Sequence, residues 1–178
     1  LCPEGDHHAV LCGFREINAN TGSHGRELTF KIVAGPGKGY EVKEALWSPS
    51  NRSAVKDERA RNRMRIFAHR LGLLKKVVGA DGKTATYQPI PGKADFPDVF
   101  GAQCVIRVRH EEREYEKDGK TRKAIDARLD FEGVYLLDDP RVAKVPRGDA
   151  QAVAAAGAVG VAALGASNGK PADTFDDI

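Results

Sequence analysis

Apolar and polar residues alternate with a period of two along most of the first 50 positions, which is the pattern of β-strands. The predicted strands are His7–Ile17, Arg26–Val33 and Tyr40–Trp47. Two segments rich in turn residues separate them, Asn18–Gly25 and Gly35–Gly39. Because each strand follows its predecessor after a turn, the three are expected to form a β-meander.

The period changes after Ser48-Pro49-Ser50, and a helix is predicted from about Ser53 to Leu71. Ser53 is a suitable N-cap and Gly72 a suitable C-terminal stop. One sector of this helix is apolar and should be buried: Ala60, Met64, Phe67, Ala68 and Leu71. A neighbouring sector is basic: Arg52, Lys56, Arg59, Arg63 and Arg70. The basic sector is either a solvated face or a ridge that follows phosphates.

The segment after the helix is irregular. Val77–Lys93 is rich in Gly and Pro and is predicted to be a loop, with a short strand at Thr84–Gln88 as its one regular element. Asp95–Gly101 is expected to form a short helical turn that leads into a second part of the sheet.

Two long strands should follow, at about Ala102–Tyr115 and Thr121–Leu137, and Asp118-Gly119 between them is a strong hairpin signal. One face of each strand is apolar: Cys104, Ile106 and Val108 on the first, and Ile125, Ala127, Leu129 and Phe131 on the second. A three-stranded meander, a helix and a hairpin follow each other in the order of an OB-fold. The expected fold class is therefore mainly β, a five-stranded OB-fold Greek-key barrel with one helix between strands 3 and 4. An α+β sandwich of the same elements is the alternative.

Charge differs between the two parts of the 178-residue chain. Residues 1–148 are expected to form the OB-fold domain, and residues 149–178 a disordered Ala/Gly-rich linker with an acidic tip. After residue 150 the chain has one Lys and three Asp, which leaves 27 Lys and Arg against 22 Asp and Glu before it. A basic domain on an acidic tether suggests a nucleic-acid binder that recruits partners. Partner-binding residues are expected in the tip: Asp173, Phe175, Asp176, Asp177 and Ile178.

The sequence gives little support to an enzyme. Gly35-Pro36-Gly37-Lys38-Gly39 lacks the Ser or Thr that follows Lys in a phosphate-binding loop, and it is predicted to be a hairpin turn instead. The His and Cys residues near the N-terminus lack the spacing of zinc ligands. No Ser/His/Asp or Cys/His arrangement is legible in the sequence. We therefore expect no enzyme activity, no cofactor and no metal site.

The compartment follows from three features. No apolar run approaches the roughly 20 residues that span a bilayer, so no membrane association is expected. The first residues are acidic where a secretion signal would be basic. Cys2, Cys12 and Cys104 are an odd number without paired spacing, which fits a reducing, cytoplasmic setting.

A basic surface with aromatic residues among it remains as the feature that carries chemistry. Single-strand binders combine phosphate contacts with rings on which bases stack. Tyr115, near the hairpin tip, is poorly placed for a core, whereas Trp47 and Tyr40 suit core packing as well as stacking. The candidate nucleic-acid-binding residues are Tyr40, Trp47, Arg59, Arg63, Arg107, Arg109, Arg113, Tyr115, Lys117, Lys120, Arg122, Lys123 and Arg128.

The end of the chain resembles the tail of bacterial single-stranded DNA-binding proteins, a low-complexity linker that closes with D-x-D-D-D-I-P-F. Here Asp173-Thr174-Phe175-Asp176-Asp177-Ile178 has a similar alternation of acidic and apolar residues, without the terminal Pro-Phe. The resemblance implies that the tip recruits replication or repair proteins.

The rest of the chain resembles a phage-associated family of single-stranded DNA-binding proteins. The family has a strand pair, then G-x-x-Y/R-G-x-x-V and an aromatic residue, a helix, and an F-x-D-L/V-x-G-x-x-V-x-V strand. Gly37–Trp47, Ser53–Leu74 and Phe96–Val108 match in this order, within residues 7–137. The resemblance implies an OB-fold that binds single-stranded DNA independently of sequence during replication or recombination. The protein is accordingly expected to act in DNA replication, recombination or repair, in the cytoplasm of a bacterium or a phage-infected cell.

The functional hypothesis is thus a non-enzymatic single-stranded DNA-binding protein. A homo-oligomer is expected, because one OB domain covers few nucleotides. The alternative is a protein-interaction module or a structural module of phage assembly, whose basic face is only solvated. A nuclease accessory or a metal-dependent enzyme is the more distant alternative.

Overall fold

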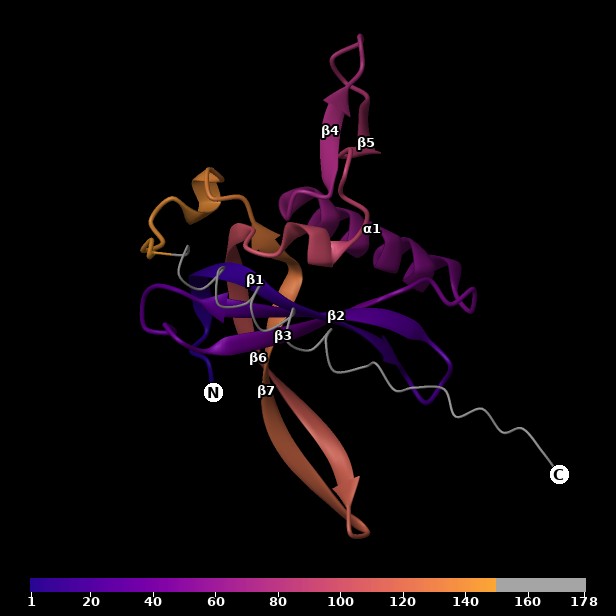
Figure 1. The fold of residues 1–178 in the computed structure, drawn as a ribbon. Coiled ribbons are helices and arrows are strands. Elements are labelled where there is room, and N and C mark those ends of the chain that lie inside the picture. Colours follow the sequence, from indigo (N-terminus) through magenta and orange to yellow (C-terminus); the bar gives the residue numbers. More distant parts are fainter. Residues whose placement is uncertain (150–178) are drawn as a thin grey trace, which may run out of the picture.

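The computed structural model describes residues 1–149, which form a five-stranded antiparallel sheet, one α-helix and a separate hairpin (Figure 1). The sheet has the order β3-β2-β1-β6-β7. Its strands are β1 (Gly5–Asn18), β2 (His24–Ile32), β3 (Glu41–Trp47), β6 (Gln103–Lys117) and β7 (Lys120–Tyr135). The predicted meander, helix and long hairpin are confirmed, and the chain is mainly β. The partner-binding residues predicted in the acidic tip lie outside the described residues.

Helix α1 (Ala54–Arg70) begins and ends where the sequence predicts. The Ser53 hydroxyl accepts the backbone N–H of Lys56 at 3.4 Å, so Ser53 is the N-cap. Gly72 follows the helix with a φ of +91°, a conformation that favours glycine.

The predicted apolar stripe attaches α1 to the sheet. Phe67, Ala68 and Leu71 are buried, and Met64 packs against the same core while partly buried. The Phe67 ring meets Phe30 of β2 edge to face, with 6.5 Å between the ring centroids. Burying one side chain of this size contributes about 1.5–3 kcal/mol, so this stripe fixes the position of the helix.

A second hairpin, β4 (Leu74–Val78) and β5 (Ala85–Pro89), stands out from the body (Figure 1). The strand predicted at Thr84–Gln88 corresponds to β5, whereas β4 was not predicted, and its last two residues fall in the segment predicted as a loop. No residue of either strand is fully buried, so the alternation that marks a half-buried strand is missing.

Short helical turns complete the fold. The turn predicted before the second part of the sheet is confirmed as η1 (Phe96–Val99), which Asp95 caps by accepting the Phe96 N–H at 2.9 Å. A second turn, η2 (Pro140–Val142), follows the sheet. Within residues 1–149 no helix has the length and apolarity that crossing a membrane requires.

A large bulge divides β7 into two parts. Ile106 pairs with Val134, whereas Val108 pairs with Leu129, so four residues of β7 lie opposite Arg107 alone. Gly133 in this bulge has a φ of +44°, and a Cβ there would approach the Leu129 Cβ to 2.9 Å. Glycine is therefore required for the bend.

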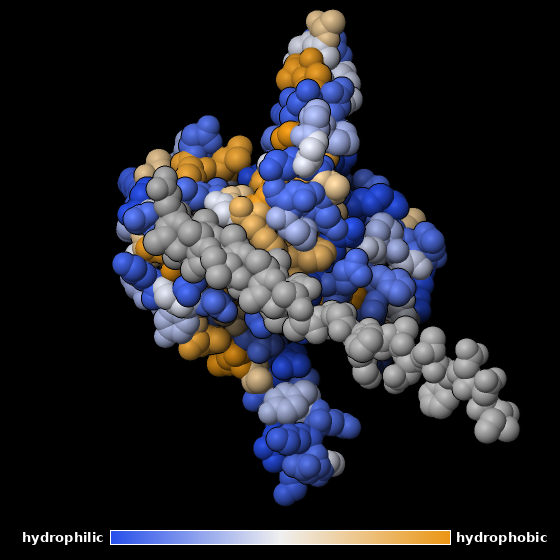
Figure 2. All heavy atoms as spheres, in the orientation of Figure 1, coloured by the Kyte–Doolittle hydropathy of each residue, from blue (hydrophilic) through white to orange (hydrophobic). Residues whose placement is uncertain are grey.

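Between this bulge and the turn at its tip, the β6–β7 hairpin extends away from the body. Residues 109–117 and 120–128 form the segment that we call the ribbon, which points away from the β4–β5 hairpin (Figure 1). Its surface is strongly hydrophilic (Figure 2). Ile125, predicted on the apolar face of its strand, is 57% exposed, so this face is not buried along its whole length. The alternation of the strand continues into the ribbon, but no core covers it there.

A buried histidine holds the end of the described chain to β1. His8 is 2% exposed, its Nδ1 accepts the Gly148 N–H at 3.0 Å, and its Nε2 lies 3.2 Å from the Gln103 side-chain oxygen. Because the Gly148 N–H can only donate, the neutral ring carries its proton on Nε2 and donates it to Gln103. Burial lowers the pKa of His8; the bond to Gln103 opposes this effect and the charge of Arg147 adds to it.

We expect stability to depend on pH through His8. A second proton would sit on Nδ1 against the Gly148 N–H, so the unfolded chain binds this proton at a higher pH than the folded chain. The contribution of His8 is therefore complete above the unfolded pKa of about 6.5 and is lost as the pH falls towards the lower folded pKa. Thermal melts at several pH values should show that, as the pH falls, the melting temperature of His8→Gln decreases less than that of the unchanged protein. Equal pH slopes for the two proteins would contradict this expectation.

Candidate nucleic-acid interface

The register of the ribbon sorts its side chains onto two faces of opposite charge. Cross-strand partners share a face, and successive pairs alternate between the faces. One face, which we call the basic face, has six cations and two acids in the pairs Arg109–Arg128, Glu111–Asp126, Arg113–Ala124, Tyr115–Arg122 and Lys117–Lys120. The acidic face has three Glu and one Lys in the pairs His110–Ala127, Glu112–Ile125, Glu114–Lys123 and Glu116–Thr121.

The ion pairs of the basic face are exposed and weak. Arg113 contacts Asp126 at 3.0 Å, and Arg122 lies 3.8 Å from Asp118 in the turn. The two Arg side chains are 57% and 48% exposed, and such pairs contribute about 0.2–1 kcal/mol. Both arginines can therefore exchange these carboxylates for the phosphates of a ligand.

A hollow of about 320 Å³ lies at the base of the basic face, between β3, α1 and the start of the ribbon. Arg109 and Arg128 belong to the basic face and also line this hollow. Trp47, Arg59 and Arg63 line it too. The hollow and the basic face together contain ten of the thirteen predicted binding residues. Five of them line the hollow, and the other five lie farther out on the basic face: Arg113, Tyr115, Lys117, Lys120 and Arg122.

Trp47 stands at the hollow with 40% of its surface exposed, so it is not a core residue. Its cross-strand partner is Gly25, and a Cβ at position 25 would come within 2.8 Å of the indole ring. The absence of a side chain at Gly25 lets the ring lie against β2. A ring that is supported by backbone and exposed elsewhere is suited to stack on a base.

Arg59 and Phe131 form a cation–π contact in the hollow. The guanidinium carbon of Arg59 lies 4.9 Å from the centroid of the Phe131 ring. Phe131 was predicted on the same apolar face as Leu129, but it lies in the bulge and lines the hollow. Gly133 in the strand interior is the sequence signal that indicates such a bulge.

Arg63 is fixed inside the wall of the hollow. Its guanidinium donates to the carbonyls of Phe131 and Asp130 at 3.2 and 3.1 Å and to Glu44 at 3.0 Å. Glu44 is 5% exposed, and its other oxygen accepts the Leu129 N–H at 2.9 Å. Glu44 therefore joins β3, β7 and α1. Arg63 supplies positive charge to the hollow, while several of its donors are used to hold the structure.

Arg107 lies outside the ribbon and is not among the residues that line the hollow. Arg107 donates two hydrogen bonds to Asp6, at 2.6 and 2.9 Å, and this pairing raises the pKa of Arg107. Its guanidinium also lies 4.8 Å from the centroid of the buried Tyr135 ring. These contacts are those of a structural ion pair.

Lys123 and Tyr40 are also separated from the basic face. Lys123 is on the acidic face, 2.7 Å from Glu112 and 3.7 Å from Glu114. Tyr40 is 44% exposed and lines a different hollow, which it shares with Arg128. Tyr40 is thus available for stacking, but beside the hollow that contains Trp47 rather than inside it.

Among residues 1–149 no three His, Cys, Asp or Glu side chains group together as metal ligands. The three cysteines are free thiols. Cys104 is a buried core side chain, and this burial raises the pKa of its thiol to about 12, so the thiol is a poor nucleophile.

The chain matches none of the protein families and none of the curated proteins with which it was compared.

Proposed function

We propose that this protein binds single-stranded DNA without sequence preference and without enzymatic activity. The strand would enter the hollow at Trp47 and Arg59 and continue along the basic face to Lys117 and Lys120. The observation that carries this proposal is the separation of charge on the ribbon, six cations and two acids on one face against one Lys and three Glu on the other. A surface charged only for solubility has no reason to place its cations on one side.

The arrangement of the strands supports an OB barrel as the framework. The order β3-β2-β1-β6-β7, with a helix after β3, is the order of the five OB strands. Glu44 of β3 accepts the Leu129 N–H of β7 at 2.9 Å, which brings the two outer strands of the sheet together. We infer that the pair completes the barrel, and that the hollow lies beside this junction.

The proposed role is in DNA replication, recombination or repair, in the cytoplasm of a bacterium or a phage-infected cell. The acidic end of the chain, with three Asp among its last six residues, would recruit the proteins that act on the bound strand. Because a single domain covers few nucleotides, we expect several copies to act together as a homo-oligomer.

Trp47 fluorescence tests the proposal, since the chain contains one tryptophan. We expect oligo-dT to quench it and to bind more tightly than a duplex of the same length, because a duplex hides the base faces. The affinity should fall as the salt concentration rises, with a logarithmic slope near −4 if all six cations of the basic face meet phosphates at about 0.7 per contact. Equal affinity for duplex and single strand, or no dependence on salt, would refute the proposal. Either result would favour the protein-interaction module instead.

A further inference from the structure

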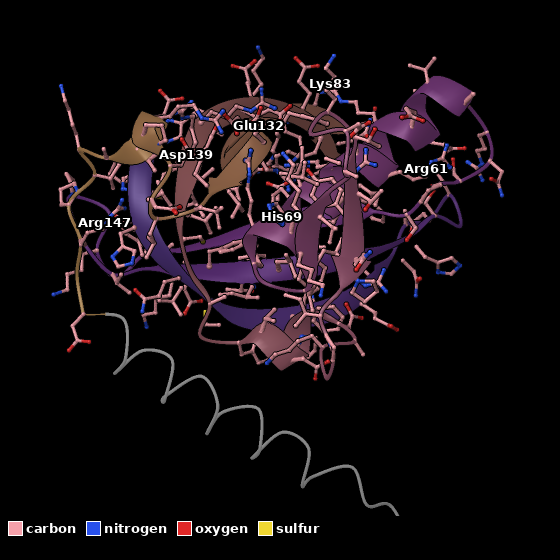
Figure 3. The ribbon with its side chains drawn as sticks, turned by 90° about the horizontal axis from the view of Figure 1, so that it is seen from above. Arg61, His69, Lys83, Glu132, Asp139 and Arg147 are labelled. Atoms are coloured by element: carbon pink, nitrogen blue, oxygen red, sulfur yellow. The ribbon has the colours of Figure 1, made fainter. Side chains whose placement is uncertain are left out.

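An apolar groove lies between α1 and the β4–β5 hairpin, away from the basic face. The hairpin is held to the helix by His69, whose Nδ1–H donates to the Leu74 carbonyl at 3.1 Å and whose ring meets Tyr87 with 5.1 Å between centroids. The groove has a volume of about 390 Å³, and its apolar lining is Pro49, Met64, Ala68, Leu74 and Tyr87. Figure 3 labels His69 and Arg61 on the helix that forms one wall.

A second hollow extends this apolar floor. It has a volume of about 230 Å³ and shares Met64, Ala68 and Leu74 with the groove. Leu73, Pro89 and the buried Phe96 continue its lining towards η1. The apolar floor is thus longer than one side chain, and it can hold two separate apolar side chains of an extended peptide.

Three arginines line the groove: Arg26, Arg61 and Arg65. Two acids face them: Asp95, 3.2 Å from Arg26, and Glu58, 4.0 Å from Arg61 with both side chains more than half exposed. The Arg65 guanidinium carbon lies 5.6 Å from the Tyr87 ring centroid. Apolar side chains surrounded by guanidinium groups suit a peptide that carries both carboxylates and apolar residues.

The groove and the hollow that contains Trp47 lie on different faces of α1. Arg61, Arg65 and Ala68 are spaced by four and three residues and line the groove, whereas Arg59 and Arg63 are spaced by four and line the hollow. A peptide in the groove therefore leaves the hollow open. This inference does not depend on the proposed binding of DNA.

We propose that the groove holds the C-terminal segment Asp173–Ile178 of the same chain. This segment carries three Asp for the three arginines, and Phe175 and Ile178 for the apolar floor. The 23 residues from 150 to 172 span up to roughly 80 Å when extended, which exceeds the width of a body of this size, about 40 Å. Tethering gives an effective concentration of the order of millimolar, so even weak docking is populated within one molecule.

Docking would set when the acidic tip is available. A tip held by Arg61 and Arg65 cannot bind a partner protein at the same time. A partner must therefore compete with the groove, whereas a nucleic acid on the basic face need not.

Hydrogen exchange of the full-length protein tests the docking. We expect amides of α1 and the β4–β5 hairpin to exchange several times faster when Asp173, Asp176 and Asp177 are changed to Lys, because the tip is released. Arg61→Glu with Arg65→Glu should give the same increase. Lys56→Glu, an exposed change on another face of α1, should not. Combining the changed tip with the changed arginines should restore part of the protection, since the opposite charges face each other again.

Three results would overturn the proposal. The first is exchange that does not respond to the tip changes, and the second is an equal increase for Lys56→Glu. The third is protection that disappears on tenfold dilution of the unchanged protein, which would place the tip of a second copy in the groove. Circular dichroism of each variant separates the loss of docking from the loss of folding.

Discussion

Replacement of Glu44 by Ala is expected to lower the free energy of unfolding by about 3 kcal/mol. The change leaves the Arg63 guanidinium, 21% exposed, and the buried Leu129 N–H without their shared acceptor. Both groups then lose a hydrogen bond in a place where water replaces it poorly. Urea denaturation followed by circular dichroism measures the loss.

Two variants serve as controls for Glu44. Glu44→Gln keeps an acceptor for the Leu129 N–H but removes the charge that faces Arg63, so we expect about 1–2 kcal/mol of destabilisation. Glu41→Ala, on the same strand, removes only an exposed pair with Lys31 at 4.0 Å and should change stability by less than about 0.5 kcal/mol. If Glu44→Ala costs no more than Glu41→Ala, then Glu44 does not join β3 to β7 as we describe.

The order and type of the main elements follow from local patterns. Alternating residues define the three meander strands, Ser53 and Gly72 mark the ends of α1, and Asp118-Gly119 marks the long hairpin. Each of these signals depends on neighbours in sequence, such as a cap, a turn conformation or one buried face. Such signals can be interpreted from the sequence without knowledge of the tertiary structure.

The features that sequence reasoning missed depend on what covers a strand. Ile125 and Leu129 have the same place in the alternation, yet Leu129 is buried and Ile125 is exposed, because the core ends between them. Phe131 lost its expected place because the bulge at Gly133 changes which face a residue points to. β4 was not predicted, because an exposed strand needs no alternation of apolar and polar residues.

The candidate site could be predicted in part. Parity along each strand groups Arg109 with Arg113, and the two-residue turn fixes the register that places Lys117 opposite Lys120. The same register places Lys123 on the acidic face, so this residue could have been separated from the sequence alone. The proximity of Trp47 and Arg59 to the ribbon could not be predicted, because three segments that are distant in the sequence form the hollow.

Reversal of charge on the basic face should have the largest effect on DNA binding. We expect Lys120→Glu to weaken binding to oligo-dT about tenfold or more at moderate salt, and Lys117→Glu with Lys120→Glu to weaken it further. Lys123→Glu is a matched control, because it makes the same change three residues along the same strand, on the acidic face. It should leave the affinity within about twofold.

Neutral substitutions distinguish phosphate contact from general attraction. A cation that meets a phosphate releases one counterion, so Lys117→Gln with Lys120→Gln should reduce the magnitude of the logarithmic salt slope by about 1.4. Lys123→Gln should leave the slope unchanged, because a distant charge shifts affinity without a counted contact. If Lys120 and Lys123 variants lose equal affinity and equal slope, the strand does not follow one face of the ribbon. The basic face would then be only part of a diffuse positive field, and the track that we propose from Trp47 outward would be wrong.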